Sequence, residues 1–215
     1  MKSFVYVLLC TFLVLLGCSK MIDDPKPKII AWGDSLTKGQ GEVKSTYPGI
    51  LQQLSSARIV NEGVNGQTST EISARMADAK DLYKYPVIIW AGRNNYKRPE
   101  QVKADISDMV SKLGHTHYLI LGILNGDKLS ERKGETGYNT ITKLNADLAI
   151  IYGEHFIDIR PYLVSQYNPQ SDADLKNFND DVPPVSLRND DLHLNSGGNK
   201  WVAEKINGKI GLLIN

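Results

Sequence analysis

The residues of this sequence with the clearest chemical potential are a serine and a histidine that lie far apart in the chain. The stretch IIAWGDSL, residues 29–36, runs from an apolar segment into a Gly-Asp-Ser turn that presents Ser35. A serine hydroxyl attacks a carbonyl carbon only when a neighbouring base removes its proton, and that base needs an acid to orient it. Ser35 therefore requires a histidine with an acidic neighbour.

His193 is the histidine whose surroundings fit this requirement. It lies in the polar stretch RNDDLHLNSGG, with Asp190 three residues earlier. Residues at this spacing share one face of a helical turn, so Asp190 could accept the Nδ1 proton while Nε2 faces Ser35. The alternative is that Asp190 and His193 only pair with each other before the last helix.

Strand-like and helix-like segments alternate along the chain, which is typical of a parallel sheet covered by helices. Continuous apolar runs suit strands buried on both faces, and they predict five strands, at residues 28–33, 57–63, 85–92, 117–124 and 155–163. Apolar spacing predicts helices over 102–113, 141–151 and 198–210. Thr46 before Tyr47-Pro48 predicts a further helix that ends at Leu54. The expected fold class is α/β, a three-layer αβα sandwich.

Three polar or flexible residues follow the first three predicted strands directly. Ser35, Gly66 and Asn94 lie just beyond these strand ends. Right-handed crossovers put the carboxyl ends of all parallel strands at one edge of the sheet, where ligands bind. We expect the three loops to meet there. The remaining histidines lie at the amino ends of predicted strands, at the opposite edge of the sheet, and are expected to be structural: His115, His117 and His155.

Four segments of the sequence resemble the four blocks of the SGNH, or GDSL, hydrolases, in the order of that family. They are GDSL at 33–36, NEGVNGQTS at 61–69, AGRNN at 91–95 and DDLH at 190–193. The resemblance implies a flavodoxin-like five-stranded parallel sheet and a serine esterase that acts through an acyl-enzyme. It also implies the nucleophile Ser35, an Asp190–His193 pair that completes the triad, and an oxyanion hole at Ser35, Gly66 and Asn94.

The proposed oxyanion hole also makes physical sense. A carbonyl oxygen gains negative charge when its carbon becomes tetrahedral, and the amides of Ser35 and Gly66 and the side-chain amide of Asn94 could donate to it. Losing one such donor typically costs about 3 to 4 kcal/mol. Gly66 has no Cβ, so its backbone can approach a substrate closely. Alternatively, Gly63 and Gly66 only shape a turn, and Asn94 caps the segment that follows.

The third block departs from the family pattern at one position. Many relatives have Asn-Asp where this chain has Asn94-Asn95, which removes one negative charge and is expected to have a small effect. Arg93 could contact an acidic substrate or pair with an aspartate, and the pair is the favoured interpretation. Asp34 is expected to brace the turn, because Asp190 has the better spacing for the triad acid.

Other function classes find no support in the sequence. Thr37 replaces the second glycine of the Gly-x-Ser-x-Gly elbow. No cysteine pair, His-Glu-x-x-His or P-loop pattern occurs, so neither a metal nor a cofactor is expected. A formal net charge of +1 supplies no broad basic surface for nucleic acid.

Residues 165–188 are expected to form a long polar loop that walls the acyl or alcohol pocket, with Tyr167 and Phe178 as apolar contacts. The acidic residues of this loop could bind calcium but are expected to be solvated: Asp172, Asp174, Asp180 and Asp181.

The N-terminal segment is expected to direct export. Residues 1–17 carry Lys2 and an apolar run from 4 to 16 that is shorter than the roughly 20 residues of a membrane span. Leu15-Leu16-Gly17-Cys18 resembles a bacterial lipobox, which implies a lipid on Cys18 that anchors the protein to a membrane of the cell envelope. Residues 18–27 would form a tether and 28–215 the hydrolase domain; plain secretion is the alternative.

The expected activity is hydrolysis of a small-molecule or glycan ester. Short acyl esters of carbohydrate, O-acetyl above all, are favoured, because export places the enzyme among such polymers. A lysophospholipase, lipase or thioesterase acting on longer acyl chains is the alternative. A glycan O-acyltransferase or a non-catalytic glycan-binding lipoprotein would retain the same fold.

Overall fold

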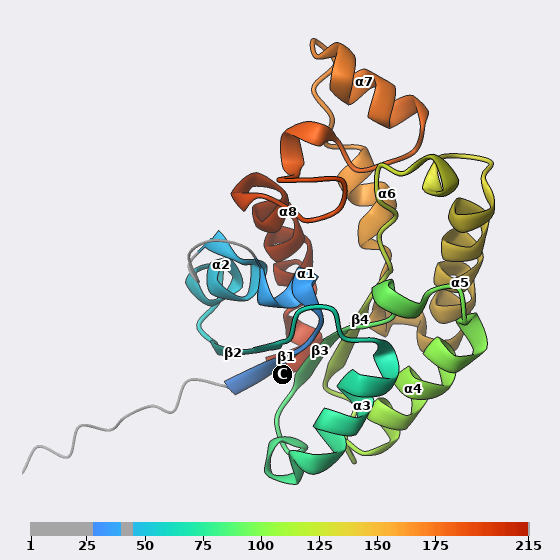
Figure 1. Ribbon diagram of the computed structural model, residues 1–215. Coiled ribbons are helices and arrows are strands. Elements are labelled where there is room, and N and C mark those ends of the chain that lie inside the picture. The colour runs from blue at the N-terminus through green and yellow to red at the C-terminus, as the bar shows by residue number, and fades with distance from the viewer. Residues whose placement is uncertain (1–27, 40–44, 215) are drawn as a thin grey trace, which may run out of the picture.

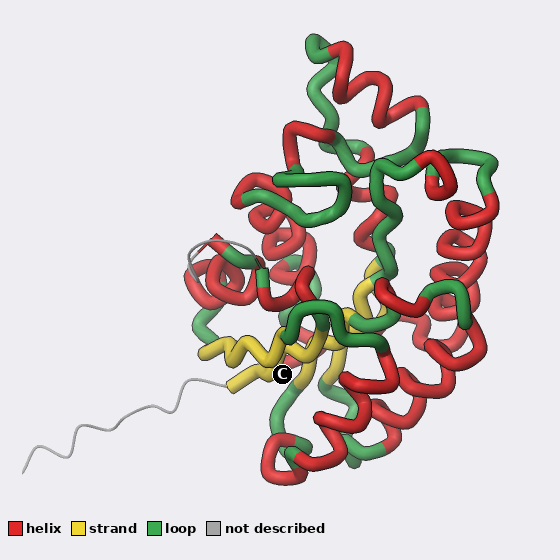
Figure 2. Tube along the Cα trace, viewed as in Figure 1, coloured by secondary structure: helices red, strands yellow, loops and turns green. Residues whose placement is uncertain are grey.

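A parallel β-sheet of five strands forms the centre of the molecule (Figures 1 and 2). The computed structural model describes residues 28–39 and 45–214. The strand order is β2-β1-β3-β4-β5, and every neighbouring pair is parallel. This order is the flavodoxin-like one, so the predicted fold class is confirmed. The strand bounds are β1 Lys28–Gly33, β2 Arg58–Gly63, β3 Val87–Trp90, β4 Tyr118–Leu121 and β5 Phe156–Ile157.

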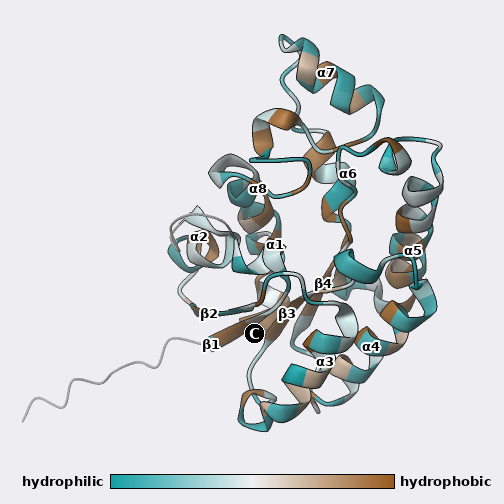
Figure 3. Ribbon diagram, viewed as in Figure 1, coloured by the Kyte–Doolittle hydropathy of each residue, from teal (hydrophilic) through white to brown (hydrophobic). Residues whose placement is uncertain are grey.

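Helices cover both faces of the sheet and so create three layers. Successive residues of a strand point to opposite faces. Ile29 and Ala31 of β1 pack against α2, α6 and α8, whereas Ile30 and Trp32 pack against α3, α4 and α5. Figure 3 shows the hydrophobic strands between these helices. The main helices are α1 Ser35–Lys38, α2 Tyr47–Leu54, α3 Ser69–Asp78, α4 Pro99–Ser111, α5 Thr136–Tyr152, α6 Ile159–Val164, α7 Asp172–Asn179, α8 Ser196–Asn207 and α9 Gly211–Ile214. Short 3-10 helices complete the fold: η2 Lys80–Leu82, η3 Arg93–Asn95, η4 Leu129–Glu131, η5 Gly153–His155 and η6 Val185–Leu187.

The predicted start of α2 agrees with its capping contact, whereas α4, α5 and α8 begin three, five and two residues earlier than predicted. The Thr46 hydroxyl accepts a hydrogen bond from the Gly49 amide at 3.4 Å, and α2 ends at Leu54 as expected. The last long helix, α8, begins at Ser196 and not at Gly198, because the Asn195 side chain accepts from the Gly198 amide at 3.1 Å. Such side-chain caps satisfy the first amides of a helix, which have no partner within it.

Some local predictions are wrong. The predicted strand at 155–163 is a strand only at Phe156–Ile157, and α6 follows it. Asp158 accepts from the Arg160 amide at 3.3 Å and so starts a helix within an apolar run that suits either structure. The apolar spacing over 141–151 suggested a buried helix face that includes Ile151, but Ile151 is 56% exposed. The strands were expected to be buried on both faces, but β2 lies at the edge of the sheet and its residues are only partly covered.

Residues 165–188 contain two helices, α7 and η6, where a loop was expected. The Ser171 hydroxyl accepts from the Asp174 amide at 3.3 Å and caps α7, which projects from one end of the molecule (Figure 1). Among the described residues, no helix has the length and apolar character to cross a bilayer. The expected signal peptide 1–17, the tether 18–27 and Cys18 lie outside the described residues.

Candidate active site

Ser35 is the first residue of α1, directly after the turn that ends β1. Asp34 precedes it as the N-cap, and its Oδ1 accepts from the Leu36 amide at 2.9 Å. At the other end of α1, the Asn61 side chain donates to the Thr37 carbonyl oxygen at 2.9 Å. A Cβ on Gly63 would lie 2.1 Å from the Lys38 nitrogen, so only glycine allows β2 to approach this turn so closely. The first two sequence blocks therefore fix the position of the serine together.

His193 lies between Ser35 and Asp190, so the structure brings these three predicted residues together. Its Nε2 is 2.9 Å from the Ser35 Oγ, and its Nδ1 is 2.8 Å from Asp190 Oδ2. Asp190 Oδ1 accepts the amides of Leu192 at 2.8 Å and His193 at 2.7 Å. Partial burial acts to raise the pKa of Asp190, but these hydrogen bonds prevail and lower it to about 2. Asp190 is therefore a carboxylate at neutral pH.

Arg188 holds the loop that carries His193, a role that was not predicted from the sequence. This buried guanidinium donates to the carbonyl oxygens of Pro183 and Asp190, both at 2.9 Å. It also donates to Asp127 Oδ2 at 3.3 Å and to the Asn177 side chain at 3.2 Å. The signal for this role was weak, because a single arginine near the fourth block does not reveal partners that lie elsewhere in the chain.

The two further residues predicted for the oxyanion hole lie beside Ser35. Gly66 has φ +74°, which favours glycine, and open space surrounds its missing Cβ. Gly66 and Asn94 line a cavity of about 260 Å³ together with Ser35, His193, Asn65 and Leu192. The Asn94 side-chain nitrogen donates to the Gln67 carbonyl oxygen at 2.9 Å and lies 3.3 Å from Asp34 Oδ2. Asn65 and Leu192 were not foreseen as lining residues.

Asp34 is an unusual carboxylate, because it is 1% exposed. Burial raises its pKa to about 6, although the Leu36 amide and the nearby Arg93 act in the opposite direction. Its contacts with Leu36 and Asn94 agree with the expected bracing role.

The predicted partner of Arg93, in the third block, is wrong. Arg93 forms its ion pair with Glu131, at 2.9 Å, and not with an aspartate. Glu131 lies 38 residues further along the chain, so no local pattern revealed this pair. Asn95, which replaces the family's aspartate, donates to the Ser69 hydroxyl at 2.8 Å and so connects η3 to α3.

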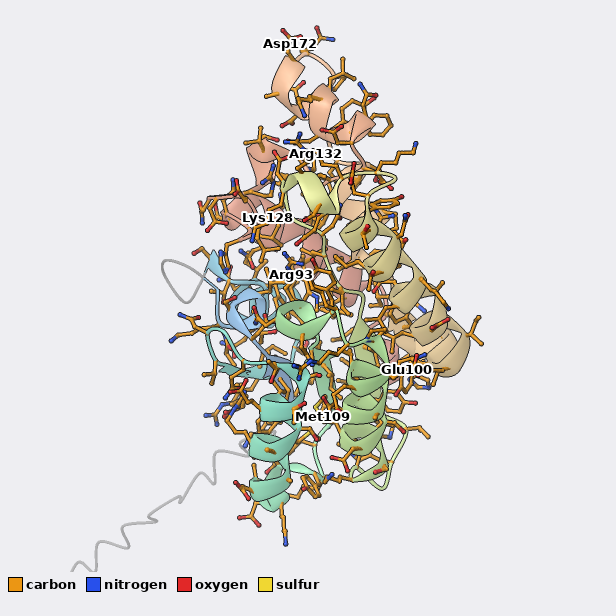
Figure 4. All side chains as sticks on the ribbon, turned by 45° about the vertical axis from the view of Figure 1, so that its right-hand side comes forward. Arg93, Glu100, Met109, Lys128, Arg132 and Asp172 are labelled. Carbon is orange, nitrogen blue, oxygen red and sulfur yellow. The ribbon has the colours of Figure 1, made fainter. Side chains whose placement is uncertain are left out.

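The segment 165–188 does not wall the cavity beside Ser35, contrary to the prediction. Tyr167 and Phe178 stack on each other with ring centroids 4.1 Å apart, and neither lines that cavity. Figure 4 shows Asp172 at the far tip of α7, away from Arg93. The segment supports the site indirectly: its Asn177 side chain accepts a hydrogen bond from Arg188, which in turn holds the loop that carries His193.

Two of the remaining histidines and one of the acidic residues of segment 165–188 have these protein partners. His115 Nε2 lies 2.9 Å from the Tyr83 carbonyl oxygen, and His155 Nδ1 lies 2.9 Å from that of Tyr118. Asp181 pairs with Arg160 at 2.9 Å. Within residues 28–39 and 45–214, no group of three or more His, Cys, Asp or Glu residues is arranged to hold a metal ion.

A flavodoxin-like parallel sheet with a serine, a histidine and an aspartate joined in this order at its carboxyl edge defines a class of serine hydrolases. The model of the GDSL-like lipase/acylhydrolase family matches residues 31–201. The chain belongs to this family and is an esterase or acylhydrolase, which confirms the resemblance of the four blocks.

Solved structures share the fold. A G-D-S-L family lipolytic protein from Desulfitobacterium hafniense DCB-2 is 24% identical, with a TM-score of 0.64, over 85% of this chain and 99% of that one. An acetyl xylan esterase, AlAXEase, is 20% identical, with a TM-score of 0.66 and the same coverage.

Among proteins compared by sequence, a tail spike protein of Salmonella phage epsilon15 is 27% identical over 118 residues, which are 53% of this chain. The match spans only 10% of that tail spike protein.

Proposed function

We propose that the protein is a serine esterase that removes short acyl groups, O-acetyl in particular, from carbohydrate. The observation that carries the proposal is the continuous hydrogen-bonded chain from Ser35 through His193 to Asp190. As the Ser35 oxygen attacks the ester carbon, His193 Nε2 takes the hydroxyl proton. Asp190 accepts a hydrogen bond from Nδ1–H and stays ionised, which fixes the ring orientation and stabilises the imidazolium that forms.

The charge that develops on the carbonyl oxygen is met by donors on three loops. The amides of Ser35 and Gly66 and the side chain of Asn94 are the proposed donors, and all three residues line the same cavity. One N–H of the Asn94 side chain donates to the Gln67 carbonyl oxygen at 2.9 Å. The other makes the longer contact, 3.3 Å, with Asp34 Oδ2, and this N–H turns to the oxyanion in the proposed reaction. His193 then protonates the leaving alcohol, and the acyl group stays on Ser35 until water, activated by His193, releases it.

The small volume and the polar lining of the cavity support a short acyl group. At about 260 Å³ it is smaller than the roughly 300 to 1,000 Å³ of drug-sized ligand sites. Leu192 is the one aliphatic side chain in its described lining, and the other lining residues are polar or glycine. A long acyl chain would leave much of its apolar surface in water at such a site.

Export to the cell envelope, with a lipid anchor on Cys18, forms part of the proposal. Its support is the sequence of residues 1–18, which combines Lys2, an apolar run and a terminal Gly-Cys pair. Several acyl chains on one residue give stable anchoring, whereas one chain gives marginal binding. Mass spectrometry of the N-terminal peptide after expression in a bacterium checks this; an unmodified Cys18 contradicts the anchor.

Hydrolysis of p-nitrophenyl acetate tests the catalytic assignment. We expect Ser35→Ala and His193→Ala each to abolish turnover, and a fluorophosphonate probe to label the native protein but not Ser35→Ala. Wild-type turnover in either variant rules out the assignment. A series of p-nitrophenyl esters tests the acyl preference: the highest kcat/KM is expected for acetate, and a maximum beyond about ten carbons would favour a lipase or thioesterase.

A further inference from the structure

A second cavity, of about 600 Å³, adjoins the one beside Ser35. Asn94 and Leu192 line both cavities, so a substrate that extends from Ser35 past these two side chains enters the second one. Four cationic residues line it, and we name it the basic cleft after them: Arg93, Lys97, Arg98 and Lys128.

The basic cleft carries an excess of positive charge. Of its described lining residues only Glu131 is acidic, and its carboxylate is already paired with Arg93 at 2.9 Å. Lys97, Arg98 and Lys128 are exposed, and none of them forms an ion pair with any other described residue. The whole chain has a formal net charge of only +1, so this is a local concentration of charge.

Three acidic residues on the flanking segments are engaged elsewhere, whereas Asp191, beside Leu192, is exposed and forms no ion pair with another described residue. Asp127 pairs with Arg132 at 2.9 Å, and Glu100 pairs with Lys103 at 2.7 Å. Glu71 accepts the backbone amide of the N-cap of its own helix, α3, at 2.8 Å. These carboxylates do not neutralise the three exposed cations of the cleft.

Arg93 adds a buried guanidinium to the wall of the cleft. Its side chain is 6% exposed, Nη2 pairs with Glu131, and the guanidinium lies 5.1 Å from the centroid of the Tyr96 ring. Nε and Nη1 are buried without a hydrogen-bond partner among the described residues, so the exposed cations carry the positive charge that a ligand would meet. In Figure 4, Arg93 and Lys128 lie near each other on the two segments that border the cleft.

We infer that the basic cleft binds an anionic group of the substrate while the ester lies at Ser35. The substrate is then an acylated acidic carbohydrate, in which a carboxylate or phosphate on the sugar faces Arg98 and Lys128. Exposed cations beside a cleft attract an anionic substrate and raise its local concentration. This inference rests on the proposed esterase function and names its substrate class.

The test compares three substrates acetylated at the same position. They are an O-acetylated methyl glucuronoside, the matching methyl glucoside and the phosphate monoester of that glucoside. The two anionic esters distinguish a carboxylate from a phosphate as the recognised group. The enzyme forms are the native protein, Arg98→Gln, Lys128→Gln and the double variant. Lys80→Gln, which removes an equally exposed cation on η2 near the amino end of β3, is the matched control.

We expect kcat/KM for at least one anionic ester to exceed that for the neutral glucoside about tenfold at low ionic strength. Each single variant should lower this ratio about threefold, and the double variant should bring it close to one. Added salt should lower the ratio in the native protein but not in the double variant, because screening acts on exposed charges. Lys80→Gln should keep the native ratio.

Equal kcat/KM values for the anionic and neutral esters in the native protein overturn the inference. A preference that survives in the double variant overturns it as well, because Arg98 and Lys128 would not be its cause. Hydrolysis of p-nitrophenyl acetate and fluorophosphonate labelling are measured in parallel. If both are present without an anionic preference, only the cleft assignment fails; if both are absent, the proposed esterase function fails.

Discussion

Asp34 Oδ2 lies 3.3 Å from the side-chain nitrogen of Asn94, so the residue before Ser35 contacts the third loop of the site directly. The other carboxylate oxygen of Asp34 accepts the Leu36 amide at 2.9 Å. One buried carboxylate thereby joins the start of α1 to Asn94, and its ionisation acts on both.

The stability of the protein should depend on pH through Asp34. Its pKa is about 6 in the folded protein and 3.8 as an ordinary carboxyl, so the folded state binds this proton more tightly than the unfolded state. The Asp34 contribution to the free energy of unfolding is therefore greatest below pH 3.8 and decreases as pH rises to about 6. The full difference is about 3 kcal/mol, at 1.36 kcal/mol per pKa unit.

Asp34→Asn should remove this decrease, because the amide does not ionise. Urea unfolding of the native protein and the variant between pH 4 and 7 measures it. Asp172→Asn, at the exposed tip of α7, removes a carboxylate far from the site and should retain the native slope. Parallel curves for Asp34→Asn and the native protein would show that Asp34 does not titrate in this interval.

Asp190→Asn should lower kcat for p-nitrophenyl acetate by about two to four orders of magnitude. An amide at this position no longer supplies the carboxylate that accepts the Nδ1 proton, so His193 loses the tautomer that serves as base. The Asn side-chain oxygen can still accept the amides of Leu192 and His193, so the loop should keep its fold. Asp191→Asn, one residue away and exposed, is the control and should stay within about twofold of native; a similar loss in both variants would show a general effect of charge.

Asn94→Ala should lower kcat about 10² to 10³-fold with little change in KM, because the lost donor acts mainly on the charge of the transition state. Steady-state kinetics of both constants checks this. Asn65→Ala removes a second asparagine from the lining of the same cavity and should change kcat by less than threefold. Equal losses in the two variants would mean that Asn94 has no special role.

Glu131→Gln should destabilise the protein by about 3 to 5 kcal/mol, because it leaves the Arg93 guanidinium buried without a counter-charge. The side chains of Arg93 and Glu131 are 6% and 4% exposed. Chemical unfolding measures the loss. Glu204→Gln, which breaks the exposed contact with Lys200 at 3.8 Å, should change stability by less than about 1 kcal/mol. Native stability in Glu131→Gln would contradict the importance of the buried pair.

The sequence predicted the position of the sheet and the approach of Ser35 to His193 because both depend on strong local signals. Continuous apolar runs form the middle of β1 and most of β3 and β4, and polar loops follow the carboxyl ends of β1, β2 and β3. The connectivity of parallel sheets then places these turns at one edge, whatever their separation in the chain.

One missed detail is local: an apolar run does not tell a strand from a buried helix, and the Asp158 cap decides for α6. The other missed details depend on contacts with distant residues. The partner of Arg93 is Glu131, and Arg188 holds the histidine loop through Asp127 and Asn177. None of these pairs has a spacing or motif that a linear sequence displays, because they form only when separate segments pack together.

Asn199 of α8 accepts the Tyr47 amide at 3.0 Å and donates to the Leu194 carbonyl oxygen at 3.1 Å, which ties the histidine loop to helix α2. Ser35 and His193 are 158 positions apart. During synthesis the serine therefore emerges long before its base, and it stays an ordinary alcohol until α8 has docked. Hydrolytic activity thus reports complete folding, and a chain released early would carry the Gly-Asp-Ser turn without the power to cleave an ester.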